Sequence, residues 1–248
     1  MITYITSSPG GSNWSHGHIQ QQGFDESNRF CALLRQDWNT PADCLFITAF
    51  PNRFDINENI RLGLRDSFIH SRLPLRSIRT LDKRNARVAH NLIEESNVIV
   101  LGGGHVGTQH EFFEQIHLRE HLEAAKDRDI IVIGISAGSM NSAKLVYAQP
   151  EEPGESAMTE DEKFFPGLGL TDVQILPHYQ KVKDDILDGR RLFEDITYAD
   201  SMGRNFLAIP DGSFIRIEGN QQILHGEGYV IHDGMIEQIS SEGDQVEL

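Results

Sequence analysis

Residues 130–141 read Ile-Ile-Val-Ile-Gly-Ile-Ser-Ala-Gly-Ser-Met-Asn, and this stretch decides the fold class that the sequence predicts. Four apolar, mostly β-branched residues open it, a pattern typical of a short buried strand. Ser136 follows, with Gly134 two positions before it and Gly138 two positions after it. G-x-S-x-G between a strand and a helix is the sequence of a sharp turn that exposes a serine hydroxyl. Ser136 is therefore a candidate nucleophile; the alternative is a structural turn with a capping serine.

Strand and helix patterns alternate on both sides of this stretch. The alternation predicts a mostly parallel sheet with helices on both faces, a three-layer α/β/α sandwich of the flavodoxin-like type. After residue 149 the pattern changes to a polar, acidic surface loop or flap, then two more strands, then short strands that predict antiparallel hairpins at the C-terminal edge. No repeat or linker interrupts the pattern, so we expect one domain over 1–248. The expected strands are 2–6, 44–50, 77–81, 97–101, 130–133, 173–176, 206–209, 214–217, 223–225, 229–232 and 235–239. A loop is expected at 7–12, and Asp55 with Glu58 three residues later resembles a capping box that opens a helix.

Composition excludes several classes of partner. The net charge is −15, from 22 basic and 37 acidic residues, which argues against sequence-independent binding to nucleic acid or to an anionic membrane. No run approaches the roughly 20 apolar residues of a membrane span, and Met1 leads directly into a strand pattern. Cys31 and Cys44 lie in apolar runs and are expected to be buried, without a disulfide. We expect a cytoplasmic protein with neither a nucleic-acid nor a membrane partner.

A nucleophilic serine needs a base, and the base needs an orienting carboxylate. Ligands of an open α/β sheet lie at the carboxyl ends of its strands. His178 and Asp211 each follow a predicted strand in that position. Each residue alone has a simpler explanation, a structural histidine and a turn aspartate. Their joint placement with Ser136 favours a Ser–His–Asp triad.

The glycine-rich stretch 102–107 has two functional interpretations. Gly102, Gly104 and Gly107 match the dinucleotide fingerprint G-x-G-x-x-G. However, the motif follows about the fourth strand rather than the first, and no acidic residue ends the next strand to bind a ribose. The preferred interpretation is a backbone loop beside Ser136, with the Gly104 and Ala137 N–H groups stabilising an oxyanion.

Residues 117–121 read H-L-R-E-H, an inverted zinc-protease motif. In an unbroken helix His110 and Glu114 would share the same stripe, but the apolar residues before and after this point face different ways, which suggests a bend. A solvated polar helix face is the preferred interpretation, and we expect no metal.

From about residue 40 onward the chain resembles the peptidase E (aspartyl dipeptidase) and cyanophycinase family of serine peptidases, which have a class I glutamine-amidotransferase-like fold. The resemblance implies a Ser136, His178 and Asp211 triad, an oxyanion hole at Gly104 and Ala137, and no metal or other cofactor. It implies hydrolysis after an N-terminal aspartate, or of aspartyl–arginine links in cyanophycin. The matching stretches, in the family's order, are L-G-G-G-H (101–105), G-I-S-A-G-S-M-N (134–141), L-P-H-Y (176–179) and A-I-P-D-G-S-F-I (208–215).

Three departures from the family pattern bear on specificity. Asp211 stands where peptidase E usually has glutamate, His105 stands where it usually has asparagine, and Ser139-Met140-Asn141 replaces Ala-Asn. Arg190 or Arg191 is the candidate for reading a substrate carboxylate, and we select Arg191 and His105 as candidate substrate-binding residues. These departures leave all three triad residues in place and bear only on aspartyl specificity.

The sequence therefore predicts a serine peptidase that hydrolyses small peptides, with aspartyl dipeptides as a candidate substrate class, and that is a monomer or homodimer. The alternative, from a different class, is a non-catalytic amidotransferase-like protein with a binding or regulatory role, which would keep the glycine–serine turn for structural reasons.

Overall fold

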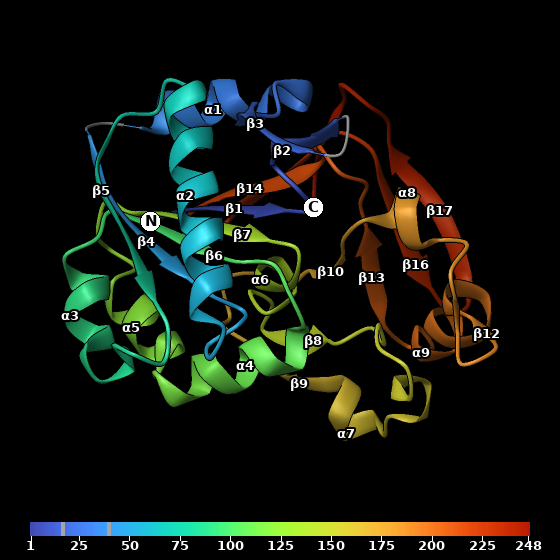
Figure 1. Cartoon of the computed structure of the whole chain (residues 1–248). Helices are drawn as coiled ribbons and strands as arrows, with labels where there is room; N and C mark the ends of the chain where they lie inside the picture. Colours follow the sequence, from blue (N-terminus) through green and yellow to red (C-terminus); the bar gives the residue numbers. More distant parts are fainter. Residues whose placement is uncertain (16–17, 39–40) are drawn as a thin grey trace.

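Five parallel strands form the centre of the main sheet of the computed structural model, which describes residues 1–15, 18–38 and 41–248 (Figure 1). Their order across the sheet is β1-β7-β6-β4-β5, so the strand that ends at the Ser136 turn, β7, lies between β1 and β6. This confirms the mostly parallel sheet. The strands are β1 (Ile2–Thr6), β4 (Ala42–Ile47), β5 (Leu75–Leu81), β6 (Val98–Leu101) and β7 (Ile131–Ile135).

Antiparallel strands extend this sheet beyond β1, as the C-terminal turn signals predicted. β14 (Phe214–Glu218) pairs with β1, β15 (Gln221–His225) pairs with β14, and β18 (Gln245–Glu247) forms the edge. The Gly219-Asn220 turn joins β14 to β15 with Glu218 opposite Gln221. The carboxyl end of β1 therefore lies beside both the β7 turn and the start of β14.

Helices cover both faces of the sheet because side chains alternate along each strand. Cys44 and Phe46 of β4 pack with α1 (Phe30–Asp37) and α2 (Phe54–His70), whereas Leu45 and Ile47 pack with the helices of the other face. That second group comprises α3 (Ala89–Glu94), α4 (Val106–Gln115) and α5 (Leu118–Ala124). Cys31 and Cys44 are both buried and both free thiols.

A second, smaller sheet stands apart from the main one (Figure 1). The predicted strands 173–176 and 206–209 form its parallel pair, so they do not extend the main sheet, and the last two predicted strands join them. One buried cluster nevertheless contains Ile5 of β1 and Ile215 of β14 together with Ile175 and Phe206 of the second sheet. The four strands are β10 (Gln174–Leu176), β13 (Asn205–Ala208), β16 (Gly228–His232) and β17 (Met235–Ser240).

The remaining elements are short. The expected loop at 7–12 contains the start of an antiparallel hairpin, and the expected surface loop at 149–165 carries two short helices and a strand. They are β2 (Gly10–Ser15), β3 (His18–Phe24), η1 (Ser27–Arg29), η2 (Ala86–Val88), α6 (Ala137–Met140), β8 (Leu145–Tyr147), η3 (Glu155–Ala157), α7 (Glu160–Lys163), β9 (Phe164–Pro166), α8 (Tyr179–Val182), β11 (Ile186–Leu187), β12 (Arg190–Arg191), η4 (Leu192–Thr197, a π-helix) and α9 (Tyr198–Asp200).

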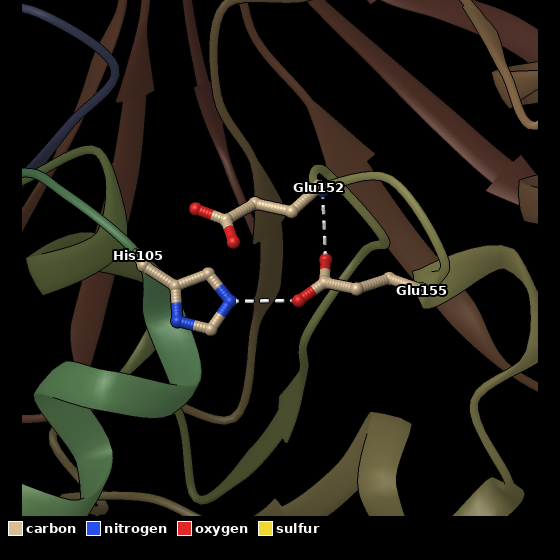
Figure 2. A group of neighbouring side chains, drawn as sticks. All are labelled: His105, Glu152 and Glu155. Atoms are coloured by element: carbon tan, nitrogen blue, oxygen red, sulfur yellow. Dashed lines mark hydrogen bonds and ion pairs between the residues drawn. The ribbon is translucent and has the colours of Figure 1, made fainter.

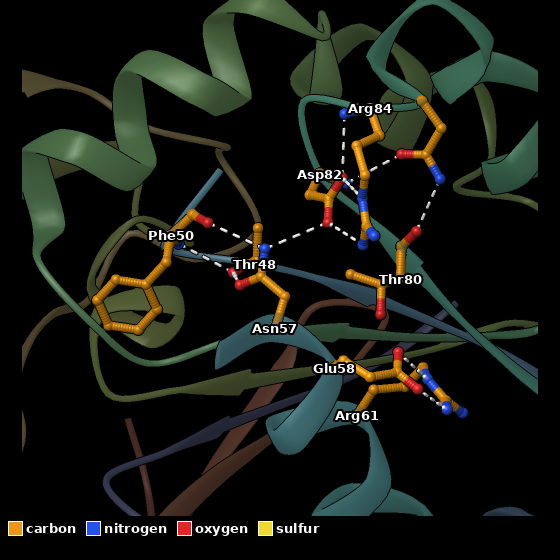
Figure 3. Close-up of polar contacts among 9 residues, drawn as sticks. Thr48, Phe50, Asn57, Glu58, Arg61, Thr80, Asp82 and Arg84 are labelled. Carbon is orange, nitrogen blue, oxygen red and sulfur yellow. Dashed lines mark hydrogen bonds and ion pairs between the residues drawn. The ribbon is translucent and has the colours of Figure 1, made fainter. Parts of the chain in front are cut away.

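A buried polar network fixes the loop between β4 and α2 (Figure 3). Thr48 donates to Asn57 Oδ1 over 2.6 Å, and the Asn57 amide donates to the Phe50 carbonyl (3.0 Å) and to Asp82 (3.2 Å). Burial tends to raise the pKa of Asp82, but hydrogen bonds from the Arg84 side chain and backbone and from Asn57 outweigh it and lower that pKa. The network holds Phe50 in place at the carboxyl edge of the sheet.

In the described part of the chain, no helix combines the length and the apolar composition that crossing a membrane requires.

Candidate active site

Ser136 lies in a strained turn between β7 and α6. Its φ of 50° and ψ of −114° are unusual for a residue with a side chain, and its N–H donates to the Thr6 and Ser7 carbonyls at the end of β1, 3.1 Å each. A Cβ at Gly138 would lie 2.3 Å from the Leu101 carbonyl oxygen, and one at Gly134 would lie 3.0 Å from Ser139. Both glycines of G-x-S-x-G are thus required by packing against neighbouring backbone.

The three residues predicted as a triad lie in hydrogen-bonded order. His178 Nε2 is 2.9 Å from Ser136 Oγ, and His178 Nδ1 is 2.6 Å from Asp211 Oδ1. His178 follows β10 and Asp211 lies beyond β13, so the second sheet supplies both partners of a serine held by the main sheet. A carboxylate beside Nδ1 favours the tautomer with its proton on Nδ1, which leaves Nε2 to accept the Ser136 proton.

Ser7, which the sequence analysis did not select, joins this arrangement. Its hydroxyl donates to Asp211 Oδ1 over 2.7 Å and accepts the His178 backbone N–H over 2.7 Å. The residue is fully buried directly after β1. No sequence motif marks it; the only signal is its position at the carboxyl end of the strand that lies beside β7.

Asp211 is held as a carboxylate by several donors. Burial tends to raise its pKa, but hydrogen bonds from His178, Lys181 and Ser7 together outweigh this effect and hold the pKa well below its usual range. Lys181 Nζ lies 2.6 Å from Asp211 Oδ2, and the Asp211 N–H donates to Gln180. Asp211 therefore stays negatively charged at any pH near neutrality.

A cavity of about 380 Å³ opens beside Ser136 and His178. Gly104 lines it on one side, residues 149–151 form another wall, and side chains from 182–192 complete it. Its size suits a short peptide segment rather than a folded chain. The wall at 149–151 includes the end of the expected flap, while the buried Gln149 side chain is hydrogen-bonded to Thr197.

Gly104 and Ala137, the predicted oxyanion donors, both border Ser136. Gly104 shares the cavity with Ser136, and the adjacent Gly103 packs so closely that a Cβ there would lie 3.3 Å from the Ser136 Cβ. Gly104 has φ of +152° and sits against Ala49 and Phe50, where a Cβ would lie within 2.9 Å of the Phe50 ring. Among the described residues, no backbone carbonyl outside helix α6 accepts a hydrogen bond from the N–H of Gly104 or from the N–H of Ala137.

The two predicted substrate-binding residues have other partners. His105 is the N-cap of α4: its Nδ1 accepts the Thr108 N–H, and its Nε2 lies 2.8 Å from Glu155 (Figure 2). Arg191 is exposed and pairs with Asp195 through two nitrogen–oxygen contacts, and it does not line the cavity. The structure thus places His105 next to the glycine loop and Arg191 away from Ser136.

The predicted alternatives at 102–107 and 117–121 can also be located. A Cβ at Gly102 would collide with the Phe46 ring at 2.7 Å, so this glycine is explained by close packing within the sheet. His117 has φ of +51° and interrupts the helix between α4 and α5, so His110 and Glu114 do not continue the H-x-x-E-H stripe. Among the described residues, the group with ligand atoms near enough for a metal is a different one: His105, Glu152 and Glu155, within 4.8 Å of one another.

The family can be assigned by comparison with known proteins. The model of peptidase family S51 matches residues 57–225, which is more than half of the chain. The chain therefore belongs to peptidase family S51, and it is a hydrolase of the serine peptidase class. A search of curated proteins gave no match.

Two solved structures share the fold. A crystal structure of a peptidase from an acI-B1 actinobacterium has a TM-score of 0.64 at 15% identity, covering 100% of this chain and 96% of the other. A peptidase E candidate from Listeria monocytogenes EGD-e has a TM-score of 0.58 at 15% identity, covering 96% of this chain and 98% of the other. These similarities confirm the predicted α/β architecture with antiparallel edge strands.

Proposed function

We propose that this serine peptidase hydrolyses small peptides with Ser136 as nucleophile, His178 as general base and acid, and Asp211 as the residue that orients the imidazole. The observation that carries the proposal is the continuous hydrogen-bond chain from Ser136 Oγ through both ring nitrogens of His178 to Asp211. It meets the geometric requirement for an activated serine.

The chemistry follows from the atoms in contact. His178 Nε2 takes the Ser136 proton while Oγ attacks the peptide carbonyl, and the Asp211 carboxylate stabilises the imidazolium that forms. The negative oxygen of the tetrahedral intermediate is placed between the Gly104 and Ala137 N–H groups. His178 then protonates the leaving amine, and water attacks the acyl-enzyme by the reverse proton path.

The positive φ of Ser136 supports its role as a nucleophile. A strained conformation of a residue with a side chain persists where the surrounding structure enforces it, and here two β1 carbonyls hold the Ser136 N–H. A serine with a purely structural role would need neither this strain nor a histidine nitrogen at 2.9 Å.

The experiment is covalent labelling with a fluorophosphonate probe. We expect wild type to label, and Ser136→Ala and His178→Ala to lose labelling, because the probe reports an activated serine. Ser241→Ala, at an exposed serine far along the chain from the triad, is the matched control and should label like wild type. Circular dichroism must show that each variant is folded.

If folded wild type stays unlabelled, the triad assignment is wrong, and the non-catalytic amidotransferase-like alternative gains support. Labelling that survives in Ser136→Ala would place the reactive serine elsewhere.

A further inference from the structure

The charges on the cavity wall beside Ser136 are unbalanced. Glu151 and Asp185 both line it, and among its described lining residues there is no lysine or arginine. Apart from Gln149, His178 and Ser136, the remaining lining residues are glycine, proline or apolar side chains. The described part of the cavity wall therefore carries two carboxyl groups and no lysine or arginine to balance them.

Glu151 is held in a fixed position on this wall. Its Oε1 accepts the Val106 N–H over 3.3 Å, and its own N–H donates to Glu155 Oε2 over 2.8 Å. Glu155 is in turn bound to His105, so the loop that carries Glu151 is tied to the residue that follows Gly104 (Figure 2). The carboxylate is thus preorganised next to the proposed oxyanion site.

No cation of the described residues forms an ion pair with either carboxylate. Burial of Glu151 within the cavity wall, together with the charges of Glu155 and Glu152, raises its pKa, although the Val106 N–H and His105 oppose this effect. The Asp185 side chain has no hydrogen bond or ion pair within the described chain. A partly desolvated carboxylate without a cation is stabilised when a ligand supplies one.

We propose that this cavity binds a positively charged side chain of the peptide, the ammonium of lysine or the guanidinium of arginine, and that it disfavours an aspartyl side chain. The inference rests on the proposed function, since it concerns the substrate of the same site. A cationic group forms a charge-assisted hydrogen bond with Glu151 or Asp185, whereas a substrate carboxylate there meets two like charges. Arg191, the residue selected to read a carboxylate, lies outside the cavity and is paired with Asp195.

The α-ammonium is common to all unblocked dipeptides, so the test has to isolate the charge of the side chain. The test compares kcat/KM for Lys-Leu, Ala-Leu and Asp-Leu and for their N-acetyl forms. We expect Lys-Leu to exceed Asp-Leu by at least about tenfold, the effect of one charged hydrogen bond. The N-acetyl forms lack the α-ammonium, so a preference for acetyl-Lys-Leu over acetyl-Ala-Leu assigns the bound cation to the side chain.

Glu151→Gln should reduce the preference for the cationic peptide by about tenfold, chiefly through KM, because it removes a charge that contacts bound substrate. Glu152→Gln is the matched control: it is adjacent and exposed, and it does not line the cavity. The comparison of the peptides as substrates of the wild-type protein tests the inference even if Glu151→Gln does not fold. Asp185→Asn provides a second variant.

The inference is overturned if protein that labels at Ser136 cleaves Asp-Leu as well as Lys-Leu and Ala-Leu, or cleaves no cationic peptide. Absence of Ser136 labelling contradicts the proposed function instead, and this inference with it. The two failures are therefore distinguishable.

Discussion

At the scale of single residues, the Ser7 hydroxyl connects both partners of Ser136. It donates to the Asp211 carboxylate and accepts the His178 backbone N–H, yet it does not line the cavity. Ser7→Ala removes one donor from Asp211 and one acceptor from His178. We expect kcat to fall by about tenfold or more, the effect of one hydrogen bond to a charged group, with KM nearly unchanged. Steady-state kinetics on a cleaved peptide measures both.

Ser8→Ala is the control for this prediction, because Ser8 is the next residue and its side chain borders a different cavity. A loss of kcat in both variants would point to distortion of the chain after β1 rather than to a specific role of Ser7. Ser7→Ala should also raise the pKa of Asp211, since it removes a hydrogen bond that lowers that pKa. A pKa that does not move contradicts the positioning role.

Sequence spacing could predict that Ser136, His178 and Asp211 lie at strand ends, because each follows a recognisable strand. It could not identify Ser7 or Lys181, because their roles depend on which strand ends lie side by side. Residue type alone predicts Arg191 as a substrate-binding residue, whereas in the structure its side chain is paired with Asp195 and does not line the cavity. The local sequence indicates where strands end and where the chain turns, but it does not indicate the direction in which a long side chain points.

At the scale of elements, the loop after β4 supports the glycine loop through Phe50. Asn57→Ala leaves the buried Asp82 carboxylate and the Phe50 carbonyl each without one donor, and it leaves the Thr48 hydroxyl without its acceptor. We expect the free energy of unfolding to fall by about 2–4 kcal/mol, as for other broken buried networks. Urea denaturation measures the loss. Because Phe50 contacts Gly104, fluorophosphonate labelling should also become slower in the folded variant.

Asn59→Ala provides the matched control, since Asn59 is the same residue type on the same helix and is exposed. We expect its stability and labelling rate to stay close to those of wild type. Equal stability losses in the two variants would mean that the network in Figure 3 does not stabilise the fold.

Two element-level expectations were wrong for identifiable reasons. The spacing of Asp55 and Glu58 predicts a capping box, but α2 begins at Phe54, with Arg53 as N-cap and no side-chain cap. Glu58 pairs with Arg61 instead. The loop predicted at 7–12 runs into the β2–β3 hairpin. Polar and glycine-rich residues suit both loops and edge hairpins, so local pattern alone did not separate them.

At the scale of the whole molecule, the second sheet could not be predicted from the strand patterns. Strands 173–176 and 206–209 have the same buried, apolar character as the strands of the main sheet, and nothing in their composition says which strands they pair with. The three predicted triad residues nevertheless lie within hydrogen-bond distance, Ser136 of His178 and His178 of Asp211, because strand ends of both sheets meet at Ser136. The buried cluster that joins the two sheets supports the expectation of one domain over 1–248, which stays a prediction.

The pH dependence of stability also belongs to the whole molecule, and His225 is the residue that we expect to dominate one pH range. His225 is 5% exposed, and its ring stacks on Phe214 at 4.7 Å. Burial, with Arg29 and Arg216 nearby, lowers its pKa from 6.5 to about 4. Between these values the unfolded chain binds a proton that the folded chain does not, so stability falls as the pH falls from about 6.5 to about 4.

The shift corresponds to a loss of about 3 kcal/mol across that range, at 1.36 kcal/mol per pKa unit. His225→Phe keeps an aromatic ring against Phe214 and removes the titrating group, so its stability should depend less on pH between 4 and 6.5. Urea denaturation at a series of pH values gives the difference curve against wild type. The same substitution at the exposed His70 controls for the loss of a histidine as such. Parallel curves for wild type and His225→Phe would show that His225 is not the source of the pH dependence in this range. Asp82 and Asp211 have lowered pKa values, so their protonation reduces stability only below the usual carboxyl pKa, outside this range.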